Sequence, residues 1–381
     1  MLIASSHYDL AIIGGGPAGT SAAITAARSG AHVALFESRS FPRHKVCGEF
    51  VSAEALDVLS ELLANATGID SLIGTAPSLH HTHLYLGNRM QQAAVSPPAV
   101  SITRYELDAA LWHAAQAAGV GCTNNCEVTS VEGEGPFRLQ TAAGPVTSRA
   151  LIVAAGRWSQ FVADRALPPG PKWIGLKAHF REARPSLSTD LYFFPHGYCG
   201  VQPVATDVVN ACAMVRSDQA SSLPDVFRSH PALQQRSASW APVTSAVSTA
   251  PLVYRRPEPV RGNMTFVGDA AAFIDPFVGD GISIALRSGR AAAQYLSKFL
   301  SGEEPLEVSI AAYQREYSKQ FAPLLAFASR VRGLLSLQGI AQIAAFEILR
   351  LPGLLPLIIR KTRRVSQTEA HGIESQRGIA T

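Results

Sequence analysis

The first forty residues contain a strand, a glycine-rich turn, a helix, a second strand and an acid in close succession. Residues 8–13 (YDLAII) are a short apolar run of strand character that leads directly into residues 14–19 (GGGPAG). A helix pattern of small residues follows and stops at Gly30, and a second strand, residues 32–36, ends at Glu37. This order constrains the fold more than any other feature, because it predicts a βαβ unit of a parallel sheet.

Each part of this unit suits a dinucleotide. Gly14 permits the tight turn, Gly16 lets the backbone approach a pyrophosphate, and Gly19 lets the helix pack closely on the sheet. The positive end of the helix holds phosphates, and Glu37 accepts hydrogen bonds from ribose hydroxyls and disfavours a 2′-phosphate. A purely structural turn is the alternative, and the motif alone does not separate NAD from FAD. The expected contacts in the turn are Gly14, Gly16, Pro17, Ala18 and Gly19.

Composition excludes several classes of protein. The chain has 381 residues, 47% hydrophobic and 16% charged, so it can bury the core of two or three domains. Its net charge of +4 is too small to indicate nucleic-acid binding. The five cysteines suggest no disulfide framework, no signal peptide is apparent, and no apolar run reaches the roughly eighteen residues of a membrane helix. We therefore expect a cytoplasmic protein.

Residues 38–52 (SRSFPRHKVCGEFVS) predict a basic loop before a helix at residues 53–64. A loop after the second strand of such a sheet lies near the ligand edge. This makes Lys45, Cys47, Gly48 and Glu49 candidates for the active site, and Ser38 and Arg39 candidates for cofactor contact. A solvated basic loop with an incidental cysteine is the alternative.

The middle of the chain changes from an α/β to a β pattern. Residues 80–92 predict a strand pair, Pro97-Pro98 are expected to break the chain, and residues 101–119 predict a strand followed by an amphipathic helix. His80, His81 and His83 are not expected to bind metal, because neighbouring strand positions face opposite ways and no carboxylate is adjacent. Strands at residues 128–140 and 146–153 then lead to Gly156.

Residues 173–216 contain strands without a long intervening helix, which favours an antiparallel sheet. We expect this second lobe, with the strands near His80, to cover the ligand. Residues 263–289 predict a strand ending at Gly268-Asp269 and a helix from residue 282 that opens after Gly279-Asp280-Gly281. The final residues are helical in pattern, and residues 341–363 fit a core helix pair better than an interfacial membrane anchor.

The glycine turn with Glu37, and the late Gly-Asp followed by Pro-x-x-Gly-x-Gly, resemble the flavoprotein monooxygenases of the p-hydroxybenzoate hydroxylase type. They resemble equally the geranylgeranyl reductase branch of the same superfamily. The resemblance implies that the cofactor is FAD, that Gly268 and Asp269 contact its ribityl chain and pyrophosphate, and that residues 276–281 lie against the isoalloxazine ring. Further contacts expected from it are Lys45, Arg104, Gly156, Gly279, Gly281 and Ile282.

The resemblance also implies the architecture. We expect an α/β fold with a Rossmann-like FAD-binding domain of the glutathione-reductase type, a second antiparallel β-sheet lobe for the substrate, and C-terminal helices. The FAD-binding domain would comprise residues 1–78, 100–165 and 260–300. The substrate lobe would comprise residues 79–99 and 166–259, and residues 301–381 would form the helical region with a polar tail.

Three segments bear on the reaction. Residues 45–49 (KVCGE) resemble the Lys-x-Cys-Gly pattern of the reductases, whereas Phe41-Pro42-Arg43 and Gly48-Glu49 also fit monooxygenases and halogenases. Residues 192–197 resemble a prenyl-reductase strand motif, but its Tyr falls on Asp190. Ala155 replaces the Asp of the hydroxylase Asp-Gly motif, so the electron donor stays open, with NAD(P)H as a transient candidate. The Trp-x-Trp-x-Ile-Pro motif of halogenases is absent from the sequence.

We expect an FAD-dependent monooxygenase that works through a flavin C4a-hydroperoxide on an apolar aromatic, polyketide-like or lipid-like molecule. The alternative is an ene-reductase of a prenyl or lipid double bond that uses Cys47, and a third reading is a flavin-binding protein without turnover. The apolar substrate follows from the aromatic residues 192–194 and Tyr198, unless these only form the lobe's core. The expected catalytic residues are Cys47, Gly48, Glu49, Pro276 and Gly279, and residues 351–364 are a candidate for peripheral membrane contact.

Overall fold

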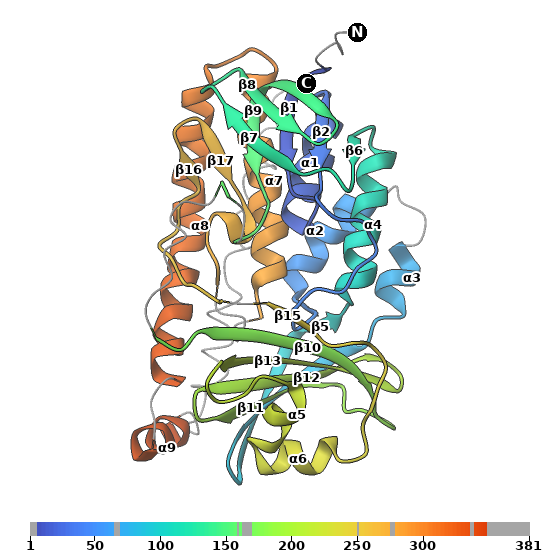
Figure 1. Cartoon of the computed structure of the whole chain (residues 1–381), viewed down its shortest axis with the longest axis vertical. Coiled ribbons are helices and arrows are strands. Elements are labelled where there is room, and N and C mark those ends of the chain that lie inside the picture. The colour runs from blue at the N-terminus through green and yellow to red at the C-terminus, as the bar shows by residue number, and fades with distance from the viewer. Residues whose placement is uncertain are drawn as a thin grey trace, which may run out of the picture.

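The computed structural model describes residues 6–64, 69–157, 160–161, 170–249, 251–274, 279–335 and 339–348. Within these residues the chain forms two β-sheets, one of which leads into the glycine-rich turn. Figure 1 shows this first sheet and its helices in the upper part of the view, and the second sheet below them. The α/β fold with a second sheet and C-terminal helices, predicted from the sequence, is confirmed.

The first sheet is built around β1, which pairs in parallel with β2 on one side and β9 on the other. The strand order is β16-β17-β9-β1-β2-β6, and β7 and β8 extend it from β9. Its strands are β1 (Ser6–Ile13), β2 (Val33–Phe36), β6 (Gly121–Thr123), β7 (Val128–Glu132), β8 (Phe137–Thr141), β9 (Gly144–Val153), β16 (Val260–Arg261) and β17 (Met264–Phe266).

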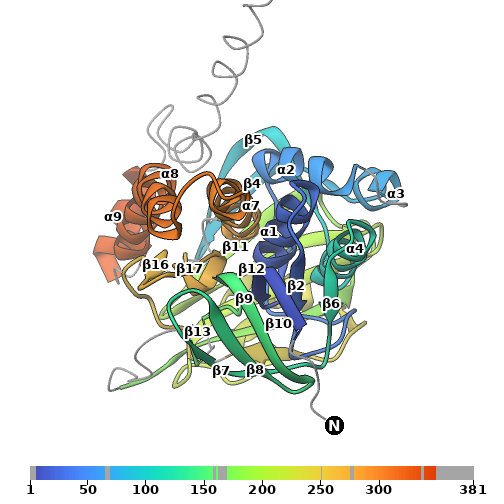
Figure 2. The same ribbon diagram turned by 90° about the horizontal axis from the view of Figure 1, so that it is seen from above.

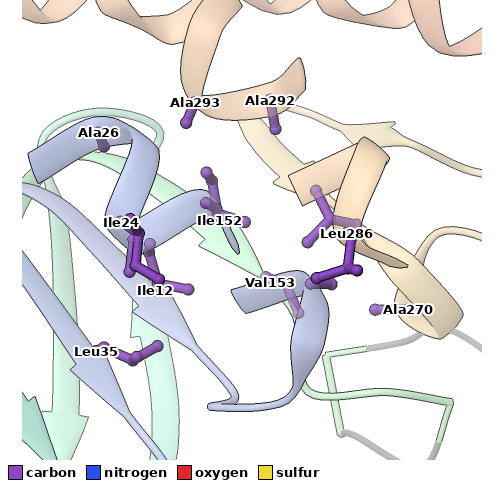
Figure 3. Packing of buried hydrophobic residues seen from close by; sticks show 14 of the residues in the cluster. Ile12, Ile24, Ala26, Leu35, Ile152, Val153, Ala270, Leu286, Ala292 and Ala293 are labelled. Carbon is purple, nitrogen blue, oxygen red and sulfur yellow. The ribbon is translucent and has the colours of Figure 1, made fainter. Parts of the chain in front are cut away.

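Two helices pack side by side on one side of this sheet, as Figure 2 shows. They are α1 (Pro17–Arg28) and α7 (Gly281–Leu300). Their small residues allow a very close approach, and the Ser21 hydroxyl donates to the Leu286 carbonyl at 2.7 Å. In Figure 3, Ile24 of α1 and Leu286 of α7 meet Ile12 and Ile152 of the sheet in the main hydrophobic core.

Apart from two short helices that accompany the second sheet, six further helices are described. They are α2 (Ala53–Leu63), α3 (Ile69–Gly74), α4 (Arg104–Ala117), the short 3₁₀ helix η1 (Gly268–Ala270), α8 (Leu306–Leu335) and α9 (Gly339–Ile348). Within α9, Phe346 is buried in a cluster with Leu86, Phe193 and Tyr198 of the second sheet. Of the predicted core helix pair at residues 341–363, the part from residue 349 onward lies outside the described residues, and so does the candidate membrane contact at residues 351–364. Among the helices that are described, none is long and apolar enough to span a bilayer.

The second sheet has the strand order β14-β10-β13-β12-β11-β4-β5-β3, and β15 pairs with β10. Neighbouring strands are antiparallel except β11 and β4, which run parallel. The helices α5 (Leu223–Arg228) and α6 (Pro231–Ser237) lie below it in Figure 1. Its strands are β3 (Phe50–Val51), β4 (Ser78–Leu86), β5 (Arg89–Ser101), β10 (Trp173–Arg181), β11 (Ser188–Phe194), β12 (Gly197–Ala205), β13 (Val208–Arg216), β14 (Ala241–Pro242) and β15 (Val247–Thr249).

The expectation that Pro97-Pro98 break the chain is wrong, because both prolines lie within β5. The pairing of β4 with β5 is irregular at this point, since Leu79 pairs with Ala99 but His81 pairs with Ala94. The prolines therefore occupy a bulge, where the missing N–H groups remove no ladder hydrogen bond.

The contact between α1 and α7 gives the first prediction. A Cβ atom on Gly289 would lie 2.1 Å from the Ala18 carbonyl oxygen, so Gly289→Ala must push the two helices apart. We expect it to lower the free energy of unfolding by about 2 to 3 kcal/mol in urea denaturation. Gly333→Ala is the matched control in α8: nothing lies within 4 Å of its Cβ position, and we expect a gain of about 0.5 to 1 kcal/mol. Equal effects at both glycines would contradict the close packing.

Candidate functional site

A cavity of about 1010 Å³ lies between the glycine-rich turn of the first sheet and the inner face of the second sheet. This volume is at the upper end of the range for small-molecule sites, about 300 to 1000 Å³. The predicted site residues that line it come from several segments far apart in the sequence: Gly14, Gly16, Pro17, Ala18, Glu37, Ser38, Arg39, Lys45, Cys47, Gly48, Glu49, Arg104, Gly156, Gly268, Asp269, Gly279, Gly281 and Ile282. Pro276 lies outside the described residues.

Two glycines of the turn are required by the fold itself, whereas a third leaves space for a ligand. Gly14 has φ +107°, and a Cβ on Gly19 would lie 1.8 Å from the Gly14 carbonyl oxygen, so both are required by the turn itself. Gly16 is different: its φ of −75° suits any residue, and the nearest atom to its Cβ position is Arg104 Nη2 at 4.0 Å. The open space above Gly16 and the uncapped start of α1 fit a bound pyrophosphate.

Glu37 lies at the end of β2 and is 5% exposed. Its carboxylate accepts hydrogen bonds from the Gly15 N–H and the Arg39 N–H, both at 3.0 Å, and forms an ion pair with Arg43 at 3.0 Å. The Ser38 hydroxyl also donates to Oε1, at 3.3 Å, so Oε1 has three of these donors and Oε2 only the Gly15 N–H. Oε2 therefore keeps an acceptor site for a ribose hydroxyl. The position suits the ribose contact expected from the sequence.

A second group of backbone N–H groups, at η1 and the start of α7, faces the glycine-rich turn. We call the glycine-rich turn with the start of α1 the first cradle, and η1 with the start of α7 the second. Gly268 and Gly279 have φ of +58° and +76°, the left-handed region that favours glycine. No atom of the described residues lies within 4 Å of the Cβ position of Gly281, the first residue of α7. The free N–H groups of this helix start therefore border open space, and the Asp269 side chain, 40% exposed, lies beside it. Both cradles fit the two ends of a flavin dinucleotide.

Glu49 holds the loop that carries Cys47 against the second sheet. It has φ +62° and is completely buried. Its carboxylate accepts hydrogen bonds from Lys177 Nζ at 2.5 Å, His179 Nε2 at 2.7 Å and the Arg104 N–H at 2.8 Å. Burial pushes the pKa of Glu49 up, but the hydrogen bond from His179 and the charge of Lys177 outweigh it and hold this pKa below its ordinary value. Glu49 is therefore an anchor rather than a free acid.

Two further contacts fix the same loop. The Asn210 side-chain amide donates to the carbonyl oxygens of Cys47 at 3.0 Å and Gly48 at 2.9 Å. Gly175 makes room for Val46, whose Cγ1 would lie 2.8 Å from a Cβ at Gly175. The Cys47 sulfur accepts a hydrogen bond from the Glu49 N–H at 3.3 Å. Burial raises the pKa of the Cys47 thiol, against the opposing charge of Arg104, so the thiol is protonated at neutral pH.

Arg104 is the first residue of α4 and is held by Asp108 in a bidentate ion pair, with both N–O distances 2.7 Å. Asp108 is completely buried. Lys45 lies close enough for the Arg104 charge to act on it, and burial together with that charge lowers the Lys45 pKa. Both cations lie on the side of the cavity where the open space above Gly16 would hold phosphates.

The inner face of the second sheet forms the cavity floor, and its composition changes from polar to apolar. Gln202, Thr189 and Thr82 lie at one end, where Thr189 donates to Gln202 at 3.1 Å. Met214 and Tyr198, which are cross-strand partners, lie at the other end. Between them the register places a row of Cys212, Gly200, Leu191 and Leu84.

The four aromatic residues expected over the ligand belong to two different hydrophobic clusters, on opposite faces of the second sheet. Phe193 and Tyr198 pack in the cluster that includes Met214, on the cavity side. Tyr192 and Phe194 point the opposite way and pack with Leu223 and Val226 of α5 in the lobe's own core. The alternation of side chains along β11 explains the split, so Phe194 belongs to the core.

Sequence reasoning missed the partners of Glu49. Lys177 and His179 lie in an otherwise apolar strand and are 1% and 5% exposed, and charged residues at alternate positions of such a strand were the available signal. It also missed the carboxylate beside the histidines: the His83 Nδ1 lies 2.7 Å from Asp190 on the neighbouring strand. Across the described part of the chain, no cluster of His, Cys, Asp or Glu is arranged to hold a metal ion.

Comparison with known families agrees with the two cradles. The family model for FAD-dependent oxidoreductases matches residues 41–295, and a second model of the same description matches residues 9–53. The chain belongs to the FAD-dependent oxidoreductase family. FAD is its cofactor, as the resemblance implied.

Among curated relatives of this FAD-dependent oxidoreductase are two kinds of reductase. It is 27% identical to menaquinone reductase of Mycobacterium tuberculosis, over 76% of this chain and 76% of the relative. It is 22% identical to digeranylgeranylglycerophospholipid reductase 2 of Methanopyrus kandleri, over 87% of each chain. A relative of another description, conditioned medium factor receptor 1 of Dictyostelium discoideum, is 25% identical over 83% of this chain and 68% of the relative.

Solved structures share the fold. The flavin-dependent brominase Bmp2 superposes with a TM-score of 0.78 at 22% identity, covering 94% of this chain and 93% of the other. PqsL of Pseudomonas aeruginosa, a probable FAD-dependent monooxygenase, superposes with a TM-score of 0.71 at 16% identity, covering 90% and 100%. At these identities the likeness concerns the fold alone.

Gly16 gives a test of the cofactor cradle. Gly16→Val strains no backbone and the nearest described atom to its Cβ is Arg104 Nη2 at 4.0 Å, whereas its two methyl groups enter the space for the pyrophosphate. We expect a folded protein whose FAD binding is weaker by about tenfold or more, measured as flavin content and by titration with FAD. Gly14→Val, by contrast, should destabilise the fold itself. Full retention of FAD by Gly16→Val would place the cofactor elsewhere.

A substitution at Glu49 tests whether this carboxylate anchors the loop that carries Cys47. Glu49→Gln keeps the shape but leaves Lys177 and His179 without their anion, so we expect the free energy of unfolding at pH 7 to fall by about 3 kcal/mol. Because the folded pKa of Glu49 is depressed, the wild-type advantage is fully present above the ordinary value of 4.5 and is lost as pH falls through the folded pKa. Denaturation at pH 7 and below 4.5 measures both effects.

The matched control is Glu258→Gln, which breaks the exposed pair with Arg261. We expect a change of less than about 1 kcal/mol there. A Glu49→Gln variant no less stable than this control at pH 7 would show that the buried cluster does not hold the loop.

Proposed function

We propose that this FAD-dependent oxidoreductase reduces a carbon–carbon double bond in an apolar, prenyl-like chain, with Cys47 as the proton donor. The observation that carries the proposal is the Cys47 thiol, which is protonated, lines the cavity and is held in place by Glu49 and Asn210. Reduction of a double bond requires a proton at one carbon, whereas hydroxylation has no evident use for such a thiol. The position of this thiol supports our proposal of a reductase over the monooxygenase expected from the sequence.

The residues of the two cradles would hold the cofactor. The turn with Arg104 and Lys45 faces the phosphates, Glu37 the ribose, Asp269 the ribityl chain, and the start of α7 the flavin ring. When bound and reduced, FAD supplies a hydride for the double bond.

Cys47 supplies the proton. Burial favours the neutral thiol, so the proton stays on Sγ until a carbon needs it. The thiolate left behind is stabilised by the Glu49 N–H at 3.3 Å and by the nearby charge of Arg104. A thiol that is neutral at rest and supported when ionised suits a general acid.

The floor suits an apolar substrate. Leu191 and Leu84 line its middle, and the Leu191 side chain reaches over Gly200, since its Cδ2 lies 3.3 Å from the position of a Cβ at that glycine. Leu252, Tyr198 and Met214 continue the apolar surface. These groups exclude water from the chain and orient it along the sheet. Their match to a long hydrocarbon agrees with the descriptions of the two reductase relatives.

A monooxygenase is the second candidate, favoured by the same water-excluding wall, which would protect a reactive oxygen species on an aromatic substrate. The two readings differ in the product. Reduction adds two hydrogen atoms and proceeds without O₂, whereas oxygenation adds an oxygen atom and requires it.

Cys47→Ala tests the proposal. With menaquinone and digeranylgeranylglycerophospholipid as probes, we expect wild-type protein reduced by dithionite to saturate a carbon–carbon double bond in the prenyl chain of at least one probe under anaerobic conditions. Cys47→Ala should lose about 100-fold or more of that rate, because the general acid is gone. Flavin content and reduction by dithionite should stay unchanged.

Cys122→Ala is the control, because Cys122 is half-buried and does not line the cavity. We expect its rate to match the wild type. If Cys47→Ala reduces the probes as fast as Cys122→Ala does, Cys47 is not the proton donor. If wild-type protein instead yields an oxygenated product only in the presence of O₂, the monooxygenase is correct.

A further inference from the structure

Three buried or half-buried arginines in this protein have very different partners. Arg104 has the bidentate pair with Asp108, and Arg236 pairs with both Asp190 and Glu182. Arg157 has a single ion pair, with Asp269 at 3.4 Å, and one hydrogen bond to the Thr249 hydroxyl at 3.2 Å. Its Nε is buried and has no hydrogen-bond partner among the described residues.

The environment of Arg157 offsets little of its charge. Its side chain is 17% exposed, whereas that of Asp269 is 40% exposed and thus partly hydrated. One face of the guanidinium lies over the Phe273 ring at 4.3 Å. Burial lowers the pKa of Arg157, whereas Asp108 outweighs burial and raises that of Arg104. A buried cation with so little compensation is costly unless an anion joins it.

Arg157 lines the cavity at the apolar end of the floor. Thr249, which it contacts, pairs with Gly175, and Gly175 pairs with Met214. Tyr254 closes this end, because its ring packs on Phe273 at 5.2 Å and its hydroxyl lies 3.1 Å from the Met214 sulfur. The guanidinium is therefore a charged group set in an otherwise apolar wall.

The other cavity arginines and lysine lie on the cofactor side or have a partner. Arg39 follows Glu37 directly in the loop expected to contact the cofactor, and its N–H donates to the Glu37 carboxylate. Arg43 is paired with Glu37, and Arg104 with Asp108. Lys45 lies beside Arg104, on the side of the glycine turn, where cofactor phosphates meet its charge. Arg157 lies between the two sides of the cavity: it pairs with Asp269, on the cofactor side, and contacts Thr249 of the second sheet, on the side assigned to the substrate.

We propose that Arg157 binds the anionic head group, a carboxylate or a phosphate, of an amphiphilic substrate whose hydrocarbon chain lies along the cavity floor. Each of the two Nη atoms carries two N–H bonds and makes one hydrogen bond, to Asp269 or to Thr249, so each keeps an N–H for an oxygen of a carboxylate or phosphate in the cavity. This inference rests on the proposed function, since it takes the floor as the place of an apolar chain. It adds an acidic head group to that substrate.

The test uses the full chain with FAD bound and three decyl probes: decanoate, decyl phosphate and 1-decanol. Isothermal titration calorimetry at pH 7.5 and fixed salt gives their dissociation constants. We expect at least one anionic probe to bind about tenfold or more tighter than decanol, and the tighter of the two names the head group. Arg157→Gln should abolish this preference and leave decanol binding unchanged, whereas Arg157→Lys should retain part of it.

Arg181→Gln is the control for long-range charge, because it removes the same charge from an exposed site, 61% exposed, on β10. It should leave the preference intact. The inference is overturned if wild-type protein binds the anions no tighter than decanol, or if Arg157→Gln keeps the preference. Loss of FAD from Arg157→Gln with the preference intact would assign Arg157 to the cofactor. If decanol itself does not bind, the cavity floor does not hold a hydrocarbon chain, and the proposed function is contradicted as well.

Discussion

The site depends on one buried carboxylate. Glu49 meets Lys177 and His179 of β10 and the first N–H group of α4, and so joins three segments that the chain brings together from distant positions. A carboxylate without these partners could not stay ionised in a fully buried position. Because it is ionised and held, the preceding residues cannot move, and Cys47 faces the cavity as a fixed group rather than as part of a loose basic loop.

The rest of the fold serves the same cavity from two sides. Close contacts of small residues, such as Gly289 against Ala18, bring α1 and α7 together so that both helix starts border one space. The second sheet supplies a floor that changes from Gln202 and Thr189 to Met214 and Tyr198 along the strands. Phosphates, flavin and hydrocarbon thus each meet a surface of matching polarity. Position and electrostatics come from the protein, while the cofactor supplies the redox chemistry.

Much of this arrangement could be predicted from the sequence where the signal is local. The strand, turn, helix and acid of residues 8–37 follow each other along the chain, and their physical roles require no distant partner. The loop of Cys47 was also found, because it follows that unit directly. The partners of Glu49 were not, since they lie 128 and 130 residues away and only the register of β10 brings them close. The same limit hid Asp190 beside His83, and the bulge that accommodates Pro97-Pro98 arises only from the pairing of β4 with β5.

The most direct test of the account is the fate of hydrogen in a single turnover. Holoenzyme reduced by dithionite is exchanged into D₂O, mixed without O₂ with digeranylgeranylglycerophospholipid or menaquinone, and the product is analysed by mass spectrometry while flavin absorbance is followed. The account predicts that the flavin is reoxidised by the substrate and that a carbon–carbon double bond of the prenyl chain gains two hydrogen atoms, at least one of them a deuteron because the Cys47 thiol exchanges in D₂O. Flavin that stays reduced until O₂ is admitted, with a product that then carries a new oxygen atom, would contradict it.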